Sequence, residues 1–177
     1  MQKKYIIKEK SKYLGDPETV VYRSSWEKAF FVFLEEASVV KFWASEEIKI
    51  QYLLLTDKKF HRYYPDVVLE LETGDKFIVE IKPFGQRILK GGKGSGRRGE
   101  MEFVKNMCKW NAAREVAKDN GIHFIILDEY DLRRIGVRIP VSRRTIPSEK
   151  ILYEKTSEFG RSVEILTAPL LKEKKKS

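Results

Sequence analysis

The sequence contains little of what several kinds of functional site require. It has one cysteine, Cys108, and two histidines, His61 and His123, in 177 residues. A single thiol excludes an internal disulfide and a cysteine-rich zinc site, and two histidines leave little room for histidine-based metal or triad chemistry. No apolar run approaches the length of a membrane span, and the opening MQKKYIIKEK lacks the apolar segment of a secretory signal. We therefore expect a protein of a reducing cytoplasm with no membrane partner.

Acidic residues are outnumbered as well. The chain has 35 Lys and Arg against 26 Asp and Glu, which gives a net charge of +9. Such an excess of cations is typical of a protein with a polyanionic partner, nucleic acid before membrane. A generally basic protein without such a partner is the alternative. Hydrophobic residues make up 42% of the chain, so it is long and apolar enough to fold as one domain around a core.

The hydrophobic pattern predicts an α/β order of helix, three strands, helix and strand. Ser24 and Glu27 have the S-x-x-E spacing of a capping box, which indicates where the first helix begins. Cys108 lies inside the second helical pattern, where a small buried thiol is expected rather than a nucleophile. The expected elements are a helix over 24–37, a strand over 46–55, a hairpin over 61–83 with its turn at 73–75, a helix over 100–118 and a strand over 122–127.

Residues 83–99 have a different character. The stretch FGQRILKGGKGSGRRG carries five cations, six glycines and no acid, which predicts a mobile basic loop. It is not a phosphate-binding P-loop, because Gly92-Lys93 is followed by Gly94 rather than by Ser or Thr.

Beyond residue 128 the pattern weakens. The stretch RRIGVRIPVSRRTIP is basic and interrupted by proline, so we expect an extension with one or two short strands. The chain is accordingly divided into a domain over 1–130, with a basic N-terminal segment, and a basic extension over 131–177 to which no role is assigned.

The hairpin places charged side chains together at one end of the predicted sheet. In FIVEIKP, alternation directs Phe77, Val79 and Ile81 to one face, and Ile78, Glu80 and Lys82 to the other. Asp66 follows a proline at the start of the preceding strand, near the point where an antiparallel partner brings Glu80 and Lys82. Two carboxylates and an ammonium are therefore expected to converge.

These residue types suit metal-assisted hydrolysis of a phosphodiester. A hard cation such as Mg²⁺ prefers oxygen ligands, which Asp66, Glu80 and the carbonyl of Ile81 can supply. Bound metal lowers the pKa of its water, and Lys82 adds positive charge where the phosphate becomes more negative. The alternative is a solvent-facing strand on which Glu80 and Lys82 only keep the sheet soluble. The motif by itself leaves both interpretations open.

Several fragments of the chain resemble a known family. They are KYLGDP (12–17), YRSSWE (22–27), WASEEI (43–48), HRYYPD (61–66), VEIKPFGQ (79–86) and KWNAA (109–113). In this order, over about residues 11–130, they are similar to the PD-(D/E)xK nucleases, and in detail to the head-completion nucleases of tailed bacteriophages. The transposon endonuclease TnsA is a more distant relative.

The resemblance implies a restriction-endonuclease-like α/β fold, a mixed central β-sheet flanked by helices. It also implies that Asp66 and Glu80 are metal ligands, together with the Ile81 carbonyl, and that Lys82 is the catalytic lysine. Glu27 becomes the acid that a helix contributes to the catalytic and metal site, although the residues alone favour a capping role for it.

Contacts to DNA are expected around this site. Arg23 and Arg62 border it, and each is suited either to a phosphate or to a salt bridge with a nearby acid. Gln86 matches a family position without a firm role, and His61 is expected to be a hydrogen-bonded structural residue. The basic loop is expected to clamp the DNA backbone, a plain linker being the alternative; its cations are Arg87, Lys90, Lys93, Arg97 and Arg98.

The resemblance implies a magnesium-dependent DNA endonuclease, with Mn²⁺ as a substitute metal, that acts in phage head completion after DNA packaging. Its partners would be DNA and the portal or other head-completion proteins, with no organic cofactor, in the cytoplasm of the infected cell or in the virion. Two alternatives stay open: a non-catalytic DNA-binding or structural head-completion protein, and a resolvase or restriction-type nuclease of the same fold.

Overall fold

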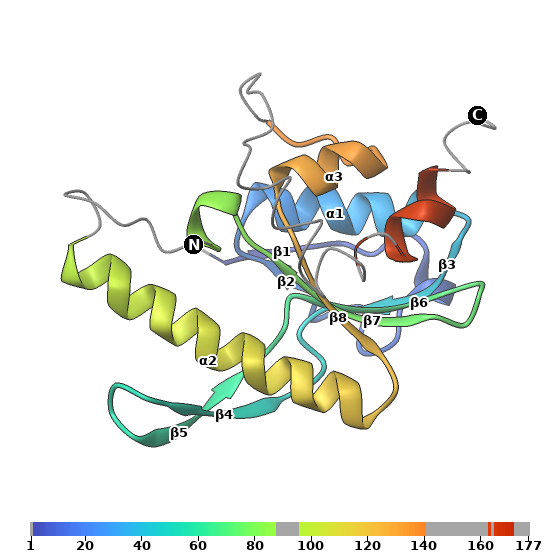
Figure 1. Ribbon diagram of the computed structural model, residues 1–177. Helices are drawn as coiled ribbons and strands as arrows, with labels where there is room; N and C mark the ends of the chain where they lie inside the picture. The colour runs from blue at the N-terminus through green and yellow to red at the C-terminus, as the bar shows by residue number, and fades with distance from the viewer. Residues whose placement is uncertain (1, 88–95, 141–162, 164, 172–177) are drawn as a thin grey trace.

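The computed structural model describes residues 2–87, 96–140, 163 and 165–171. The chain forms a central sheet with helices on both faces and a separate hairpin beside it (Figure 1). The strands are β1 (Lys3–Lys4), β2 (Val21–Tyr22), β3 (Val40–Ala44), β4 (Ile50–Leu54), β5 (Lys59–Tyr63), β6 (Val67–Leu71), β7 (Lys76–Ile81) and β8 (His123–Leu127). The labelled helices are α1 (Ser25–Glu36), α2 (Arg97–Asp119) and α3 (Glu129–Ile135), with short 3-10 helices η1 (Lys10–Lys12) and η2 (Phe84–Gln86), and residues 165–171 are also helical.

The central sheet is mixed and has the order β3-β6-β7-β8. The β3–β6 and β6–β7 pairs are antiparallel, whereas β7 and β8 are parallel. Parallel neighbours need a long crossover, and here it includes α2. The predicted α/β fold, a mixed sheet flanked by helices, is confirmed.

The two faces of the sheet bury separate hydrophobic clusters. Phe77, Val79 and Ile81 belong to the cluster that includes residues of α1 and α3. Ile78 belongs to the cluster on the other face, which includes Trp110 of α2 and residues of β4 and β5. The alternation predicted for β7 is therefore correct, and Glu80 and Lys82 lie on the side of α2 and the β4–β5 hairpin.

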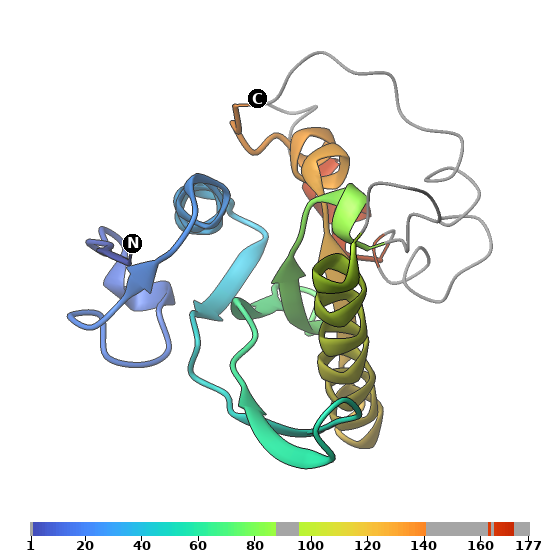
Figure 2. The ribbon, with the colours of Figure 1, turned by 90° about the vertical axis from the view of Figure 1, so that its left-hand side faces the viewer.

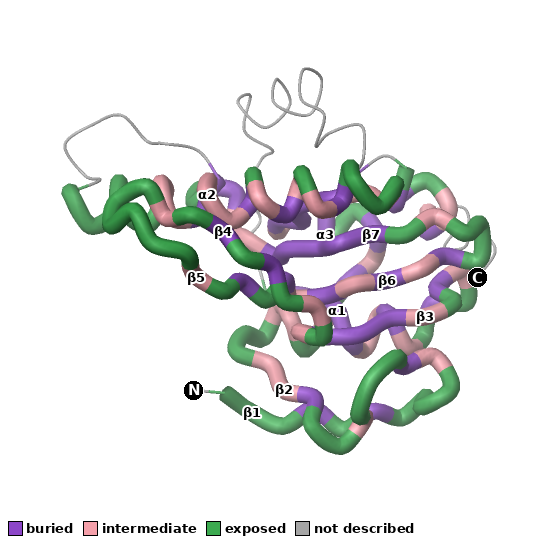
Figure 3. Tube along the Cα trace, turned by 90° about the horizontal axis from the view of Figure 1, so that it is seen from below, coloured by how far each residue is buried: buried purple, intermediate pink, exposed green. Residues whose placement is uncertain are grey.

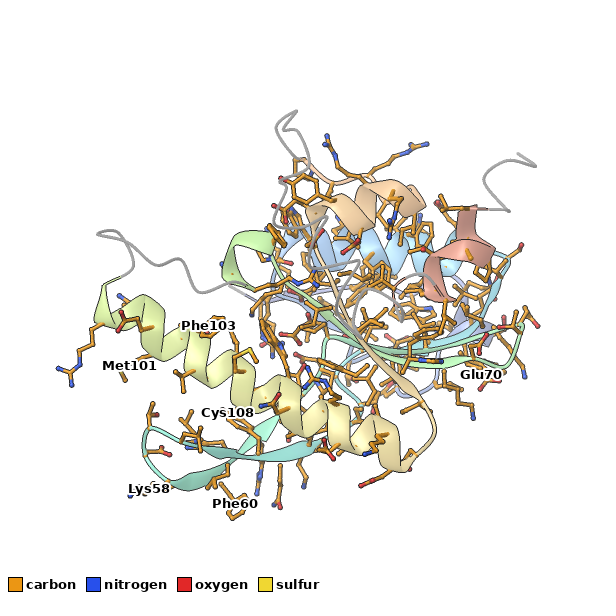
Figure 4. The ribbon with its side chains drawn as sticks, in the orientation of Figure 1. Lys58, Phe60, Glu70, Met101, Phe103 and Cys108 are labelled. Carbon is orange, nitrogen blue, oxygen red and sulfur yellow. The ribbon has the colours of Figure 1, made fainter. Side chains whose placement is uncertain are left out.

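The β4–β5 hairpin differs from the prediction. Residues 61–66 were expected to begin one strand that continued to the turn at 73–75, but β5 ends at Tyr63 and pairs with β4. Pro65 separates it from β6, because proline has no N–H to donate to a ladder. The outer side of this hairpin is exposed (Figure 3), and Lys58 and Phe60 point away from α2 (Figure 4). The strand β3 was not predicted.

The turn between β6 and β7 is as predicted. Gly74 has a φ of 89°, in the region that glycine adopts most easily, and its N–H donates to the carbonyl of Leu71 at 2.9 Å. Val67 pairs with Val79 and Leu69 with Phe77, so the register of the hairpin is regular.

The C-terminal part departs from the predicted extension. Residues 129–135 form α3, and the described residues beyond 128 form no strand. Ile135, Val137 and Ile139 belong to the main core cluster, as do Val163 and Leu166. A boundary at residue 130 therefore cuts through a continuous core, because buried apolar residues on both sides of it pack together. None of the described helices is both long and apolar enough to span a bilayer.

Candidate active site

The β6–β7 hairpin brings Asp66 to the end of β7. The backbone N–H of Ile81 donates to Oδ2 of Asp66 at 2.7 Å. Because Asp66 immediately precedes β6, its carboxylate lies at the sheet edge where β7 ends, as the sequence predicted. Within the described part of the chain, Oδ1 of Asp66 accepts no hydrogen bond, so one oxygen is left to bind another group.

Glu80 is held from two elements. Its side chain is buried, the hydroxyl of Tyr63 donates to its Oε2 at 2.6 Å, and Nζ of Lys82 lies 3.7 Å from its Oε1. Tyr63 ends β5, so the β4–β5 hairpin fixes an acid on β7. Lys82 is only partly buried, and its backbone N–H donates to the carbonyl of Leu127 on β8 at 2.9 Å.

The two carboxyls are electrostatically strained. Burial raises the pKa of Asp66 well above its usual value, and the charge of Glu80 raises it further. Burial also raises the pKa of Glu80, while Lys82, the Tyr63 hydroxyl and Lys109 oppose that rise. The pKa of the Tyr63 hydroxyl is raised well above its usual value by its own burial and by Glu80. A positive charge between the two acids would relieve this strain.

Glu27 lies at the start of α1 and near the acid pair. The hydroxyl of Ser24 accepts the N–H of Glu27 at 3.1 Å and caps α1, whereas Oε2 of Glu27 accepts the N–H of Arg23 at 2.8 Å rather than that of Ser24, so the capping box is only half formed. The charge of Glu27 is also among the causes that raise the pKa of Asp66, so the side chain lies near the acid pair. Figure 2 looks onto this edge of the sheet, with α1, α2 and the β4–β5 hairpin around it.

The donor set fits a hard divalent cation. Asp66 and Glu80 offer carboxylate oxygens, and their mutual repulsion indicates a place where positive charge is stabilising. Among the described residues, no group of three or more His, Cys, Asp and Glu side chains is gathered in metal-binding geometry. The set is therefore two carboxylates, to which the backbone of Ile81 and the nearby Glu27 are candidate additions.

Lys109 was missed by the sequence analysis. It projects from α2, and its Nζ lies over the ring of Tyr63, 5.4 Å from the centroid. Burial lowers the pKa of Lys109, Glu80 opposes this shift, and Lys105 and Lys82 add to it. The charged groups of these side chains are therefore close together. The fragment KWNAA contains Lys109, but no local pattern distinguishes it from the other lysines of the helix.

Of the three candidate DNA contacts outside the basic loop, one is paired with an acid and two are exposed. Arg23 forms an ion pair with Glu46, so the salt bridge considered for it is present, and His61 bonds to Asp57 at 2.8 Å as a structural histidine. Arg62 and Gln86 are exposed on β5 and η2.

The cations predicted for the basic loop are not all in a loop. Arg97 and Arg98 are exposed in the first turn of α2, which begins before the predicted residue 100. Lys90 and Lys93 lie outside the described residues.

Arg87 requires a correction. Its side chain is only 3% exposed, and its Nη1 lies 2.6 Å from Oδ2 of Asp128 and 3.5 Å from Oδ2 of Asp131. Asp128 also caps α3, with its side chain accepting the N–H groups of Tyr130 and Asp131. Arg87 therefore joins η2 to α3 and has no exposed guanidinium to offer a phosphate.

A mixed sheet flanked by helices, with two carboxylates and a lysine at the end of an antiparallel hairpin, defines the class as a restriction-endonuclease-like nuclease core. A family model described as the TnsA-like endonuclease N terminal matches residues 37–129, which include Asp66, Glu80 and Lys82. The head completion nuclease of Enterobacteria phage T4 is 34% identical in an alignment of 143 residues, and the match covers 76% of this chain and 95% of that protein. The chain therefore belongs to the head completion nucleases of the TnsA-like endonuclease family.

Proposed function

We propose that this protein is a divalent-metal-dependent DNA endonuclease that acts in phage head completion. The observation that supports it most is the buried Glu80 next to the half-buried Asp66 at one edge of the sheet, with Nζ of Lys82 3.7 Å from Glu80. Two carboxylates held close together away from water destabilise the folded state, and such pairs are concentrated in active sites. The setting in head completion rests on the relative from phage T4.

The residues of the chain would divide the work as follows. Asp66 and Glu80, with the Ile81 carbonyl and Glu27 beside them, would hold Mg²⁺ or Mn²⁺. The bound metal would lower the pKa of a water and neutralise charge on the phosphate. Tyr63 keeps the Glu80 carboxylate in place through its 2.6 Å hydrogen bond. Lys82, which lies 3.7 Å from Glu80, provides a fixed positive charge for the phosphate in the transition state.

DNA is the substrate that fits the net charge of +9. Arg62 and Gln86 are exposed, as are Arg97 and Arg98, so these residues remain candidates for phosphate contacts. Lys90 and Lys93 remain predictions from the sequence. A portal or another head-completion protein as partner, and the cytoplasm of the infected cell or the virion as location, also remain predictions.

The test compares variants at the two ends of the β6–β7 hairpin: Asp66 and Glu80 lie at its open end, and Glu70 lies next to its turn. Asp66→Asn and Glu80→Ala should abolish cleavage of linear, nicked, branched and single-stranded DNA but leave DNA affinity in EDTA largely unchanged. Lys82→Ala should lower kcat by about 10²–10³-fold, the usual cost of one transition-state charge contact. Glu70→Ala is the matched control, because Glu70 lies on β6 far from the site (Figure 4) and pairs on the surface with Lys41 and Lys76.

Metal dependence has a readout that does not rely on turnover. Titration calorimetry should show Mn²⁺ or Mg²⁺ binding to the wild type and to Glu70→Ala, and no binding to Asp66→Asn. Full cleavage by Asp66→Asn would refute the site, and full cleavage by the wild type in excess EDTA would refute the dependence on metal.

A further inference from the structure

The helix α2 carries a row of basic residues that leads away from the acid pair. Lys109 stands at one end of it, with Nζ 5.4 Å from the centroid of the Tyr63 ring and near enough to Glu80 to influence its pKa. Lys105 and Glu102 are close enough to Lys109 to influence its pKa in turn. This part of α2 therefore shares the electrostatic environment of the site.

Helical geometry shows which other cations lie on this side. Each residue turns the helix by about 100°, so Lys105 lies about 40° from Lys109, Glu102 about 20° and Arg98 about 20°. Arg97, although it is the neighbour of Arg98 in sequence, lies about 120° away. Lys109, Lys105 and Arg98 thus form one stripe, which includes the single acid Glu102.

The stripe also leads outward from the active site along the axis of α2, as the path of a bound DNA strand would. A rise of about 1.5 Å per residue places Lys105 about 6 Å and Arg98 about 16 Å from Lys109 along the helix axis. The first turns of α2 extend beyond the edge of the central sheet, next to the β4–β5 hairpin (Figure 1). A strand whose phosphate reached Lys82 could continue outward along this stripe.

We propose that Lys109, Lys105 and Arg98 form a phosphate-binding track that guides one DNA strand into the active site. The proposal rests on the proposed function for the identity of the substrate, and it adds the path that the strand follows. The track contacts phosphates rather than base edges, so it confers affinity and direction without sequence specificity.

The experiment uses two triple variants of the full chain that remove the same charge from the same helix. The track variant is Arg98→Gln/Lys105→Gln/Lys109→Gln. The control is Arg97→Gln/Arg114→Gln/Lys118→Gln, whose positions lie about 120°, 140° and 180° from Lys109. The binding of each protein to a fluorescein-labelled duplex of about three helical turns is measured by anisotropy in EDTA, so that no cleavage occurs.

Each lost phosphate contact removes about 0.9 from the slope of log K against log salt. The track variant should therefore have a slope about 2.7 units shallower than the wild type. Between about 50 and 200 mM salt, its affinity should fall about 40-fold less than that of the wild type. The control should differ from the wild type by at most about one contact, roughly 0.9 units, because Arg97 is its single member that is also a candidate for a phosphate contact.

Equal slopes in the two variants would mean that only the total charge matters, and an unchanged slope in the track variant would mean that the stripe does not touch DNA. Either result overturns the track. If Lys109→Gln lowers the melting temperature, the Arg98→Gln/Lys105→Gln pair serves instead, with an expected change of about 1.8 units.

Lys109 also needs a test of its own, because it contacts Tyr63. If Lys109 has only a structural role, Lys109→Gln should have a lower kcat and a lower melting temperature than the wild type, with KM and the salt slope unchanged. That outcome removes Lys109 from the track. In the proposed role, KM rises and Lys109→Arg restores it.

Failure of the track leaves the nuclease assignment intact, because Asp66→Asn would still abolish cleavage. Failure of the nuclease assignment appears instead as an Asp66→Asn variant that cleaves normally.

Discussion

Replacement of Arg87 distinguishes a structural cation from a DNA contact. The guanidinium lies 2.6 Å from Asp128 and 3.5 Å from Asp131, and the side chains of both acids are buried. Arg87→Ala removes the buried cation that these two carboxylates share, in an environment that water does not screen, and leaves Asp131 its longer pairing with Arg134 at 3.6 Å. The variant should be much less stable than the wild type and should bind DNA with unchanged affinity.

The magnitude follows from the burial of the pair. Breaking a buried ion pair from one side costs about 3–5 kcal/mol, whereas an exposed pair contributes about 1 kcal/mol or less. With the side chains of Arg87 and Asp128 at 3% and 0% exposure, the first range applies. For a chain of this size, about 2–4 °C is lost per kcal/mol, so the melting temperature should fall by roughly 6–20 °C.

Urea unfolding and calorimetry measure the stability, and anisotropy measures DNA affinity below the transition. Arg138→Ala is the control, since Arg138 is exposed and its loss should change the free energy of unfolding by no more than about 0.5 kcal/mol. An Arg87→Ala variant that kept its stability and lost DNA affinity would contradict the buried ion pair and restore Arg87 to the DNA surface.

Three further outcomes are expected. Tyr63→Phe removes the 2.6 Å hydrogen bond to Glu80 and should lower the free energy of unfolding by about 1.5–3 kcal/mol in urea titrations, and an unchanged midpoint would show that the bond is not formed. The raised pKa of Asp66 means that the folded state favours the neutral acid, so the contribution of this carboxyl to the stability of the metal-free protein is greatest near and below its ordinary pKa and is lost as pH rises through the raised value. Asp66→Asn cannot ionise; it should therefore melt above the metal-free wild type at neutral pH and lose that advantage near pH 4, and a constant difference across this range would refute the shift. Gly74→Ala should cost about 1–2 kcal/mol because φ is 89° there, and since a Cβ would meet no atom within 4 Å, a larger loss would mean that the turn has another role.

The elements next to the site could be predicted because local rules determine them. Alternation in FIVEIKP assigned Glu80 and Lys82 to one face, and the glycine turn at 73–75 fixed the antiparallel partner that brings Asp66 near them. The resemblance supplied Glu27, which the local pattern assigned to capping alone. In the structure its carboxylate accepts the N–H of Arg23, just before α1, and its charge acts on Asp66.

The errors concern contacts between distant parts of the chain. Arg87 was assigned to a loop by its neighbours in sequence, but its partners Asp128 and Asp131 lie more than forty residues later. Lys109 belongs to the site only because α2 packs against the β4–β5 hairpin and brings it over Tyr63, and no short-range pattern contains that fact. The prediction merged β5 with β6 because only residues 64–66 separate the two strands in a stretch that is otherwise rich in β-forming residues.

The parallel pairing of β7 with β8 has a consequence for the time at which the site is completed while the chain is being synthesised. The strand that carries Glu80 bonds on one side to a neighbour made just before it, and on the other side to β8, which ends 46 residues after β7. At about 5–20 residues per second, a ribosome needs roughly 2–9 s to make that stretch. Until then Lys82 lacks its backbone bond to Leu127, and Lys109 has not reached Tyr63. A nascent chain can therefore display both acids on a finished hairpin without yet having a complete site for cutting DNA.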